Sequence, residues 1–156
     1  MKKRTVQRTI RWAIVLVWMG LIFYLSHQPG DVSSELSSGV LHTIVQGITL
    51  IFPFAIEDPE QLHFILRKGA HFSVYFFLGI FIFRALKVDW PFSLQTALIA
   101  LVLSSIYAIS DEVHQLFIPG RSGEVRDVLI DSLGALVGIS FYMFLIFLFQ
   151  KRKRRL

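Results

Sequence analysis

The sequence predicts an all-α polytopic membrane protein, a four-helix transmembrane bundle with an extracytoplasmic amphipathic helix. Its 156 residues are 54% hydrophobic and 14% aromatic, which is too apolar for a soluble domain of this length. The apolar residues also collect in four windows, near 10–25, 70–86, 94–109 and 128–149. The first and third windows are short for a hydrocarbon core of about 30 Å, so polar residues that flank them are expected to reach the interface. The length predicts one domain, 1–156.

Basic residues predict the orientation. Twelve of the sixteen Lys and Arg residues precede the first window, lie between the second and third, or follow the fourth. By the positive-inside rule these segments, including both termini, are expected in the cytoplasm. The basic residues flank apolar runs and form no broad polar surface, so nucleic acid is not an expected partner. The chain has no cysteine, which excludes disulfides and thiolate metal sites.

The connections between the windows carry their own signals. Pro29-Gly30 ends the first helix, and residues 32–52 predict an interfacial amphipathic helix because their apolar residues recur at helical spacing. Asp58-Pro59 begins a helix expected to run unbroken into 70–86. Gly134 and Gly138 form a GxxxG pair, which favours close packing between membrane helices.

This topology brings many polar side chains to the extracytoplasmic end of the bundle. Four of them are acid–base candidates: His114, Asp111, Glu112 and His71. The others are ligand-binding candidates: Arg67, Lys68, Gln115, Arg121, Arg126, Asp127, Asp131 and His27. Ionisable residues within membrane segments are costly and commonly mark functional sites. Cations and two helix N-termini at one place predict an anion site.

Several of these residues have structural alternatives. His114 is either a general base held by Asp111 or part of a polar pair at a helix end. Asp131, the deepest acid, is either functional or a structural partner for Arg121 or Arg126. The two arginines are candidate phosphate or carboxylate forks, with pairing to Asp127 and Glu124 as the alternative.

We expect neither a cofactor nor a metal. His114, Asp111, His71 and His27 could together ligate an ion, but their spacing matches no known ligand motif.

Three stretches carry a family resemblance: Arg67-Lys68-Gly69-Ala70-His71-Phe72, Asp111 to Gln115 with Pro119-Gly120-Arg121, and Arg126-Asp127 with Asp131 to Gly134. They resemble the VanZ-like family of bacterial membrane proteins, over about residues 10–145. Family members often have Asn where this chain has Asp131 or Ser132. The founding member is associated with low-level resistance to the glycopeptide teicoplanin. The resemblance therefore implies a multi-pass protein of the bacterial cell membrane with a cell-envelope role.

Three functions are compatible with this sequence. The first is a membrane-embedded enzyme acting on a phosphorylated or acylated envelope lipid, such as a polyprenyl-linked or phospholipid substrate. The second is a non-catalytic binder of a cell-wall precursor or of the lipid tail of a glycopeptide, with 32–52 as the contact segment. The third is a small lipid or proton-coupled carrier, although four short spans are few for alternating access.

Overall fold

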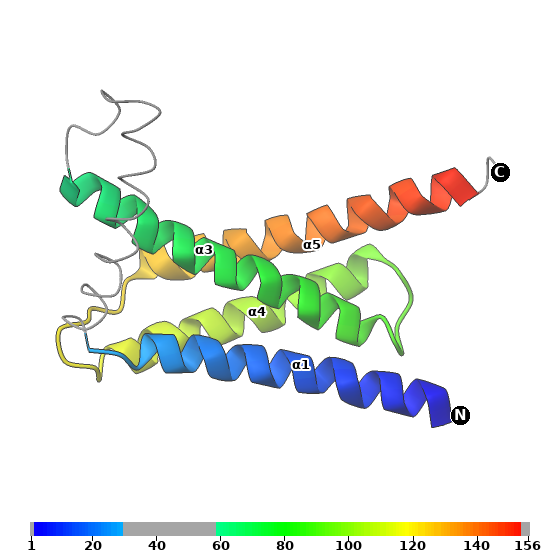
Figure 1. Ribbon diagram of the computed structural model, residues 1–156, viewed down its shortest axis with the longest axis horizontal. Helices are drawn as coiled ribbons and strands as arrows, with labels where there is room; N and C mark the ends of the chain where they lie inside the picture. The colour runs from blue at the N-terminus through cyan, green and yellow to red at the C-terminus, as the bar shows by residue number, and fades with distance from the viewer. Residues whose placement is uncertain (1, 30–58, 154–156) are drawn as a thin grey trace, which may run out of the picture.

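The computed structural model describes residues 2–29 and 59–153, and this part of the chain is a bundle of four α-helices (Figure 1). They are α1 (Lys2–Ser26), α3 (Pro59–Leu86), α4 (Leu94–Gln115) and α5 (Val125–Lys153). Each of the four contains a stretch long and apolar enough to cross a membrane. The predicted all-α, four-helix class is therefore confirmed. The predicted interfacial helix at 32–52 lies outside the described residues.

The helices extend beyond the apolar windows, because a helix continues to pair its own backbone groups where its side chains become polar. The third window was expected to end near residue 109, but α4 runs to Gln115. Asp111 and Glu112 are therefore helical residues inside the bundle. Likewise α5 begins at Val125, so Asp131 lies nearly two turns inside it.

The closest packing in the bundle is between α3 and α5. Gly134 and Gly138 of α5 lie directly beneath the backbone carbonyls of Phe72 and Phe76. A Cβ at either glycine would come within 3.0 Å of those oxygens, so the two backbones meet where only hydrogen fits. Gly79 of α3 makes the same kind of approach to Ala135. The GxxxG pair thus sets the spacing of the helices that carry His71 and Asp131.

The bundle core lies along α3. Tyr75, Leu78 and Phe83 are fully buried there, and α1 packs across α3 and α4. Two hydrogen bonds attach α1: the Trp18 indole Nε1 donates to the Val74 carbonyl at 2.9 Å, and the Tyr107 hydroxyl donates to the Met19 carbonyl at 2.6 Å. Large apolar side chains cover much of the outside of the bundle, as a lipid-facing surface requires.

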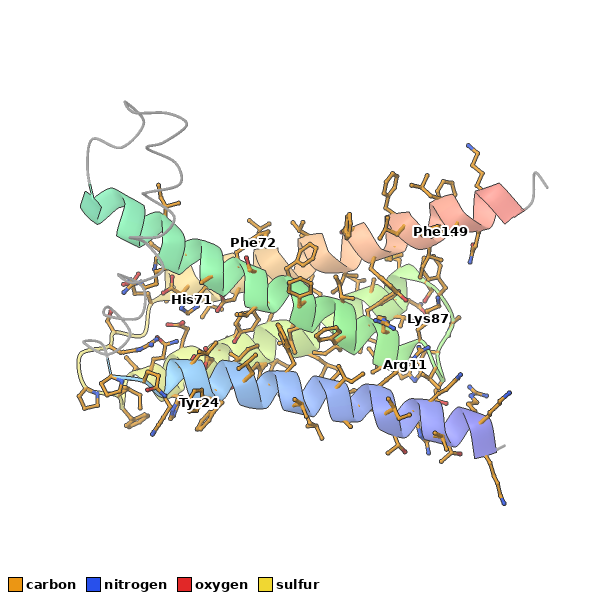
Figure 2. All side chains as sticks on the ribbon, viewed as in Figure 1. Arg11, Tyr24, His71, Phe72, Lys87 and Phe149 are labelled. Atoms are coloured by element: carbon orange, nitrogen blue, oxygen red, sulfur yellow. The ribbon has the colours of Figure 1, made fainter. Side chains whose placement is uncertain are left out.

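The two ends of the bundle differ. The chain termini and the α3–α4 connection share one end, and the start of α3 and the α4–α5 loop share the other (Figure 1). At the terminal end, Arg4 lies 3.2 Å from Asp89 and Arg11 Nη1 donates to the Arg84 carbonyl at 2.7 Å. Figure 2 shows Arg11 and Lys87 at this end and His71 toward the other. The segregation of basic residues follows the predicted topology, and the cytoplasmic assignment stays a prediction.

Candidate functional site

Three helices place carboxylate and imidazole groups inside the end of the bundle opposite the termini. His71 projects from α3, Asp111 and Glu112 from α4, and Asp131 from α5. Asp131 is fully buried, and Asp111 and Glu112 are 3% and 4% exposed. Carboxylates this deeply buried require partners, because burial strongly disfavours an isolated charge.

His71 and Asp131 face each other between α3 and α5. The His71 Nδ1 lies 3.4 Å from the Asp131 Oδ1, close enough for charge attraction but not aligned as a hydrogen bond. Both Asp131 oxygens and His71 Nδ1 have no hydrogen-bond partner in the described protein. The His71 side chain retains 13% exposure while Asp131 has none. His71 therefore connects the buried acid to the surface.

The two carboxylates of α4 are held by neighbouring polar groups. Asp111 Oδ2 accepts from the Ser26 hydroxyl at 2.8 Å and from Gln115 Nε2 at 3.4 Å. Glu112 Oε1 accepts from the same Gln115 Nε2 at 3.2 Å, and its Oε2 accepts from the backbone N–H of Glu124 at 2.9 Å. The second oxygen of Asp111 has no partner in the described protein. Glu112 is thus oriented from both sides, and Asp111 from one.

Lys68 is a buried cation at this end of the bundle. Its ammonium forms an ion pair with Asp127 and a second one with Glu124 at 3.2 Å. Arg67 lies 3.9 Å from Glu124 at the surface. The Lys68 ammonium, with its hydrogen bond and its charge, holds the pKa of the Glu124 carboxyl below its ordinary value. Lys68 therefore completes an ion-pair network around the N-terminus of α5.

Arg121 ties the α4–α5 loop to the end of α1. Its guanidinium donates to the carbonyl oxygens of Gln28 at 2.9 Å and Leu25 at 3.1 Å, and to the Gln115 side chain at 3.5 Å. Gly120 makes the turn before it, with a φ of 72° that favours glycine. The suggested ion pairs of Arg121 with Asp131 or Asp127 are not present among the described residues.

Arg126 lies at the surface of this end of the bundle. Its side chain is exposed, and within the described part of the chain it makes neither an ion pair nor a hydrogen bond. It remains available to an anion from outside.

His114 turns away from Asp111. Its Nε2 lies 3.2 Å from Nδ1 of His27, and its ring stacks on Phe23 with centroids 4.5 Å apart. Helical spacing placed Asp111 and His114 on one face, but α4 buries Asp111, Glu112 and Gln115 and leaves His114 at the edge. The expected histidine–carboxylate pair is therefore formed by His71 with Asp131. No observation here tests the functional roles themselves, which stay predictions.

Two further polar residues, Ser26 and Tyr75, belong with the buried polar side chains of this end, and the sequence did not predict them. Ser26 hydrogen-bonds Asp111. Tyr75 is fully buried, and its hydroxyl has no hydrogen-bond partner in the described protein. Tyr75 could have been predicted from its position four residues after His71, which places it one turn further along the same face of α3. Ser26 had no such signal, because its contact depends on how α1 packs against α4.

The polar residues at this end of the bundle are suited to three kinds of chemistry. Buried carboxylates beside an imidazole can take up or release a proton, exposed Arg67 and Arg126 can meet an anion, and His71, Glu112 and Asp131 could hold a metal ion. All three occur at the end of the bundle opposite the chain termini (Figure 1).

One comparison with known proteins identifies the family. The sequence model of the VanZ/LLP1 family matches residues 11–148, which include most of α1 and α5, all of α3 and α4, and every residue of the polar end described above. Comparison with the curated proteins and with the solved structures finds no match. The matched region exceeds half of the chain by a wide margin, and the chain belongs to the VanZ/LLP1 family.

Proposed function

We propose that this protein acts in the bacterial cell envelope on an anionic lipid or lipid-linked precursor, at the extracytoplasmic face of the membrane. In this proposal, exposed Arg67 and Arg126 attract the head group, and His71 with Asp131 transfers a proton during chemistry on it. The substrate class is a phosphorylated or acylated envelope lipid. A link to teicoplanin resistance comes only from the family resemblance and forms part of this proposal.

The observation that carries the proposal is the His71–Asp131 pair. An imidazole that is nearly buried, 3.4 Å from a fully buried carboxylate, has the arrangement of a base oriented by an acid. A purely structural pair would be expected to complete its hydrogen bonds, since an unsatisfied buried polar group costs about 1–3 kcal/mol. Here His71 Nδ1 and both Asp131 oxygens are unsatisfied within the described protein. Such a cost is typical of a site that completes its contacts with a ligand.

The test is turnover by purified protein in detergent or nanodiscs, with a panel of polyprenyl phosphates and phospholipids. We expect His71→Asn to abolish turnover while lipid binding, measured by native mass spectrometry, is retained. His114→Asn is the matched control, because it removes an imidazole at the same end but outside the buried cluster, and it is expected to keep wild-type turnover. Equal turnover by His71→Asn would exclude the proposed base.

A non-catalytic binder is the second candidate. It is favoured by the ion pairs of Lys68 and the backbone hydrogen bonds of Arg121, which commit two of the four cations to holding the fold. If wild-type protein binds a lipid of the panel but converts none, this reading replaces the first. Arg126→Gln is then expected to weaken binding, and His71→Asn is not.

A further inference from the structure

We propose that His71, Glu112 and Asp131 form a binding site for a divalent transition-metal cation. This inference goes beyond the proposed function and can be tested separately from it, because metal binding can be measured without any lipid. With an ion bound, His71 and Asp131 are its ligands and not a proton-transferring pair. It also revises the expectation from the sequence, where donor spacing gave no metal motif. The three donors come from three different helices, so no local spacing could reveal them.

The geometry suits an ion. One ligand atom from each residue lies within 4.8 Å of the other two. Donors to a tetrahedral zinc ion lie about 2.0–2.2 Å from the metal and therefore about 3.3–3.6 Å from one another. His71 Nδ1 and Asp131 Oδ1 are already 3.4 Å apart, so binding requires the Glu112 side chain to approach this pair by about an ångström at most. The packing of α5 against α3 at Gly134 holds His71 and Asp131 near each other without an ion.

The hydrogen bonds of these three residues also support a metal site. Asp131 is fully buried, and neither of its oxygens has a hydrogen-bond partner in the described protein, nor does His71 Nδ1. Asp111 Oδ1 and the Tyr75 hydroxyl are also unpartnered there. Glu112, by contrast, is held by Gln115 and by the Glu124 N–H. Hydrogen bonds that orient a ligand from behind are typical of metal sites.

Charge gives a third, independent argument. Asp111, Glu112 and Asp131 are three buried carboxylates, and among the described residues no Lys or Arg forms an ion pair with any of them. Lys68 is already paired with Asp127 and Glu124. A divalent cation would compensate much of this buried negative charge, which otherwise carries a large desolvation penalty.

The donor set selects the kind of ion. One imidazole nitrogen with carboxylate oxygens suits Zn²⁺ or Mn²⁺, whereas Mg²⁺ and Ca²⁺ favour oxygen donors alone. Three protein ligands also leave at least one coordination position open. We commit to Zn²⁺ as the first probe and to Mn²⁺ as the second.

The experiment measures metal content and thermal stability of the full chain in detergent, without any lipid substrate. After reconstitution and removal of excess ion, wild type is expected to retain about one Zn²⁺ or Mn²⁺ per chain. Asp131→Asn and His71→Asn are expected to bind at least about tenfold more weakly. His114→Asn is the matched control and is expected to bind as wild type does. Chelation should lower the wild-type melting temperature, and the ion should restore it.

Each other result overturns the inference. Wild type that takes up neither ion and is insensitive to chelation would do so directly, without reliance on any variant. Binding that is lost in His114→Asn but kept in His71→Asn would place the ion at the His27–His114 pair. Since these readouts involve no lipid, a failed metal site and a failed lipid function are distinguishable.

Discussion

Lys68 stabilises the polar end of the bundle through its ion pairs. Its side chain is only 9% exposed, and it neutralises Asp127, whose side chain is 5% exposed, together with the more open Glu124. The macrodipole of α5 also favours Asp127 in the first turn of that helix. Removing the ammonium would leave a buried carboxylate without its cation.

We therefore expect Lys68→Met to destabilise the protein by about 3–5 kcal/mol, the usual cost of breaking a buried ion pair from one side. The measurement is reversible unfolding in mixed micelles. Lys68→Met combined with Asp127→Asn should recover part of the loss, because neither partner is then charged. A Lys68→Met protein as stable as wild type would show that Asp127 does not need this cation.

Glu124 gives a pH dependence with a definite sign. Lys68 lowers its pKa in the folded protein below the ordinary value of 4.5. Its ion pair therefore contributes stability that is fully present above that value and is lost as the pH falls through the lower, folded pKa. The effect is small, under about 1 kcal/mol, because Glu124 is partly exposed.

The check is the melting temperature of wild type and Glu124→Gln as a function of pH. Wild type should be the more stable of the two at pH 7, and the difference should shrink as the pH falls below 4.5. A difference that stays constant, or grows, in acid would contradict the assigned pairing.

At the level of single residues, the sequence predicted which side chains gather but not how they pair. Helical spacing allowed Asp111 to face His114 and allowed His71 to face either α4 or α5. Which of these pairs forms depends on the rotation of α4 about its axis and on the packing of α3 against α5. Neither can be predicted from the sequence of one helix alone. This is why His71, rather than His114, is the imidazole beside a buried acid.

Among the elements, α3 and α5 form the pair that positions the site. Without water in the bilayer, helix association relies on close packing rather than on the hydrophobic effect. Gly134 and Gly138 allow it by bringing the backbone of α5 against the carbonyls of Phe72 and Phe76. His71 precedes Phe72, so the same contact sets its distance from Asp131.

Gly138→Ala is expected to destabilise the bundle by about 1–3 kcal/mol, because its methyl group would overlap a backbone oxygen that cannot rotate away. Gly20→Ala is the matched control. It adds the same methyl group to α1 where no atom lies within 4 Å, and it is expected to be neutral or stabilising by up to about 1 kcal/mol. The two variants unfolding alike would argue against glycine-mediated packing.

The elements themselves could be predicted well and their ends less well. Apolar windows located all four membrane helices, and the proline at residue 59 marked the start of α3. The apolar windows near 94–109 and 128–149 are shorter than α4 and α5, because a hydropathy window stops at the first charged residues. In this protein those charged residues include the buried Asp111, Glu112 and Asp131.

Across the whole molecule, the topology separates two chemically different ends. The termini and the α3–α4 connection lie together, and the cluster lies at the opposite end (Figure 1). Four membrane helices return both termini to one side, and the distribution of basic residues along the sequence predicted the same arrangement. Which side faces the cytoplasm depends on the positive-inside rule.

The absence of native cysteine allows a direct test of that orientation by single-cysteine labelling in intact cells. A membrane-impermeant maleimide should label Arg126→Cys and should label Lys3→Cys only after the membrane is permeabilised. Both positions are exposed, so accessibility within the protein does not separate them. The reverse pattern would place the polar cluster in the cytoplasm.

The central claim is that His71 and Asp131 act together on an anionic lipid head group that Arg67 and Arg126 attract. The most direct measurement is an experimental structure of the wild-type chain in nanodiscs made from native bacterial lipids. The account predicts head-group density that contacts Arg126 or Arg67 and reaches toward His71. Lipid density confined to the rest of the bundle, with His71 and Asp131 hydrogen-bonded only to each other, would contradict it.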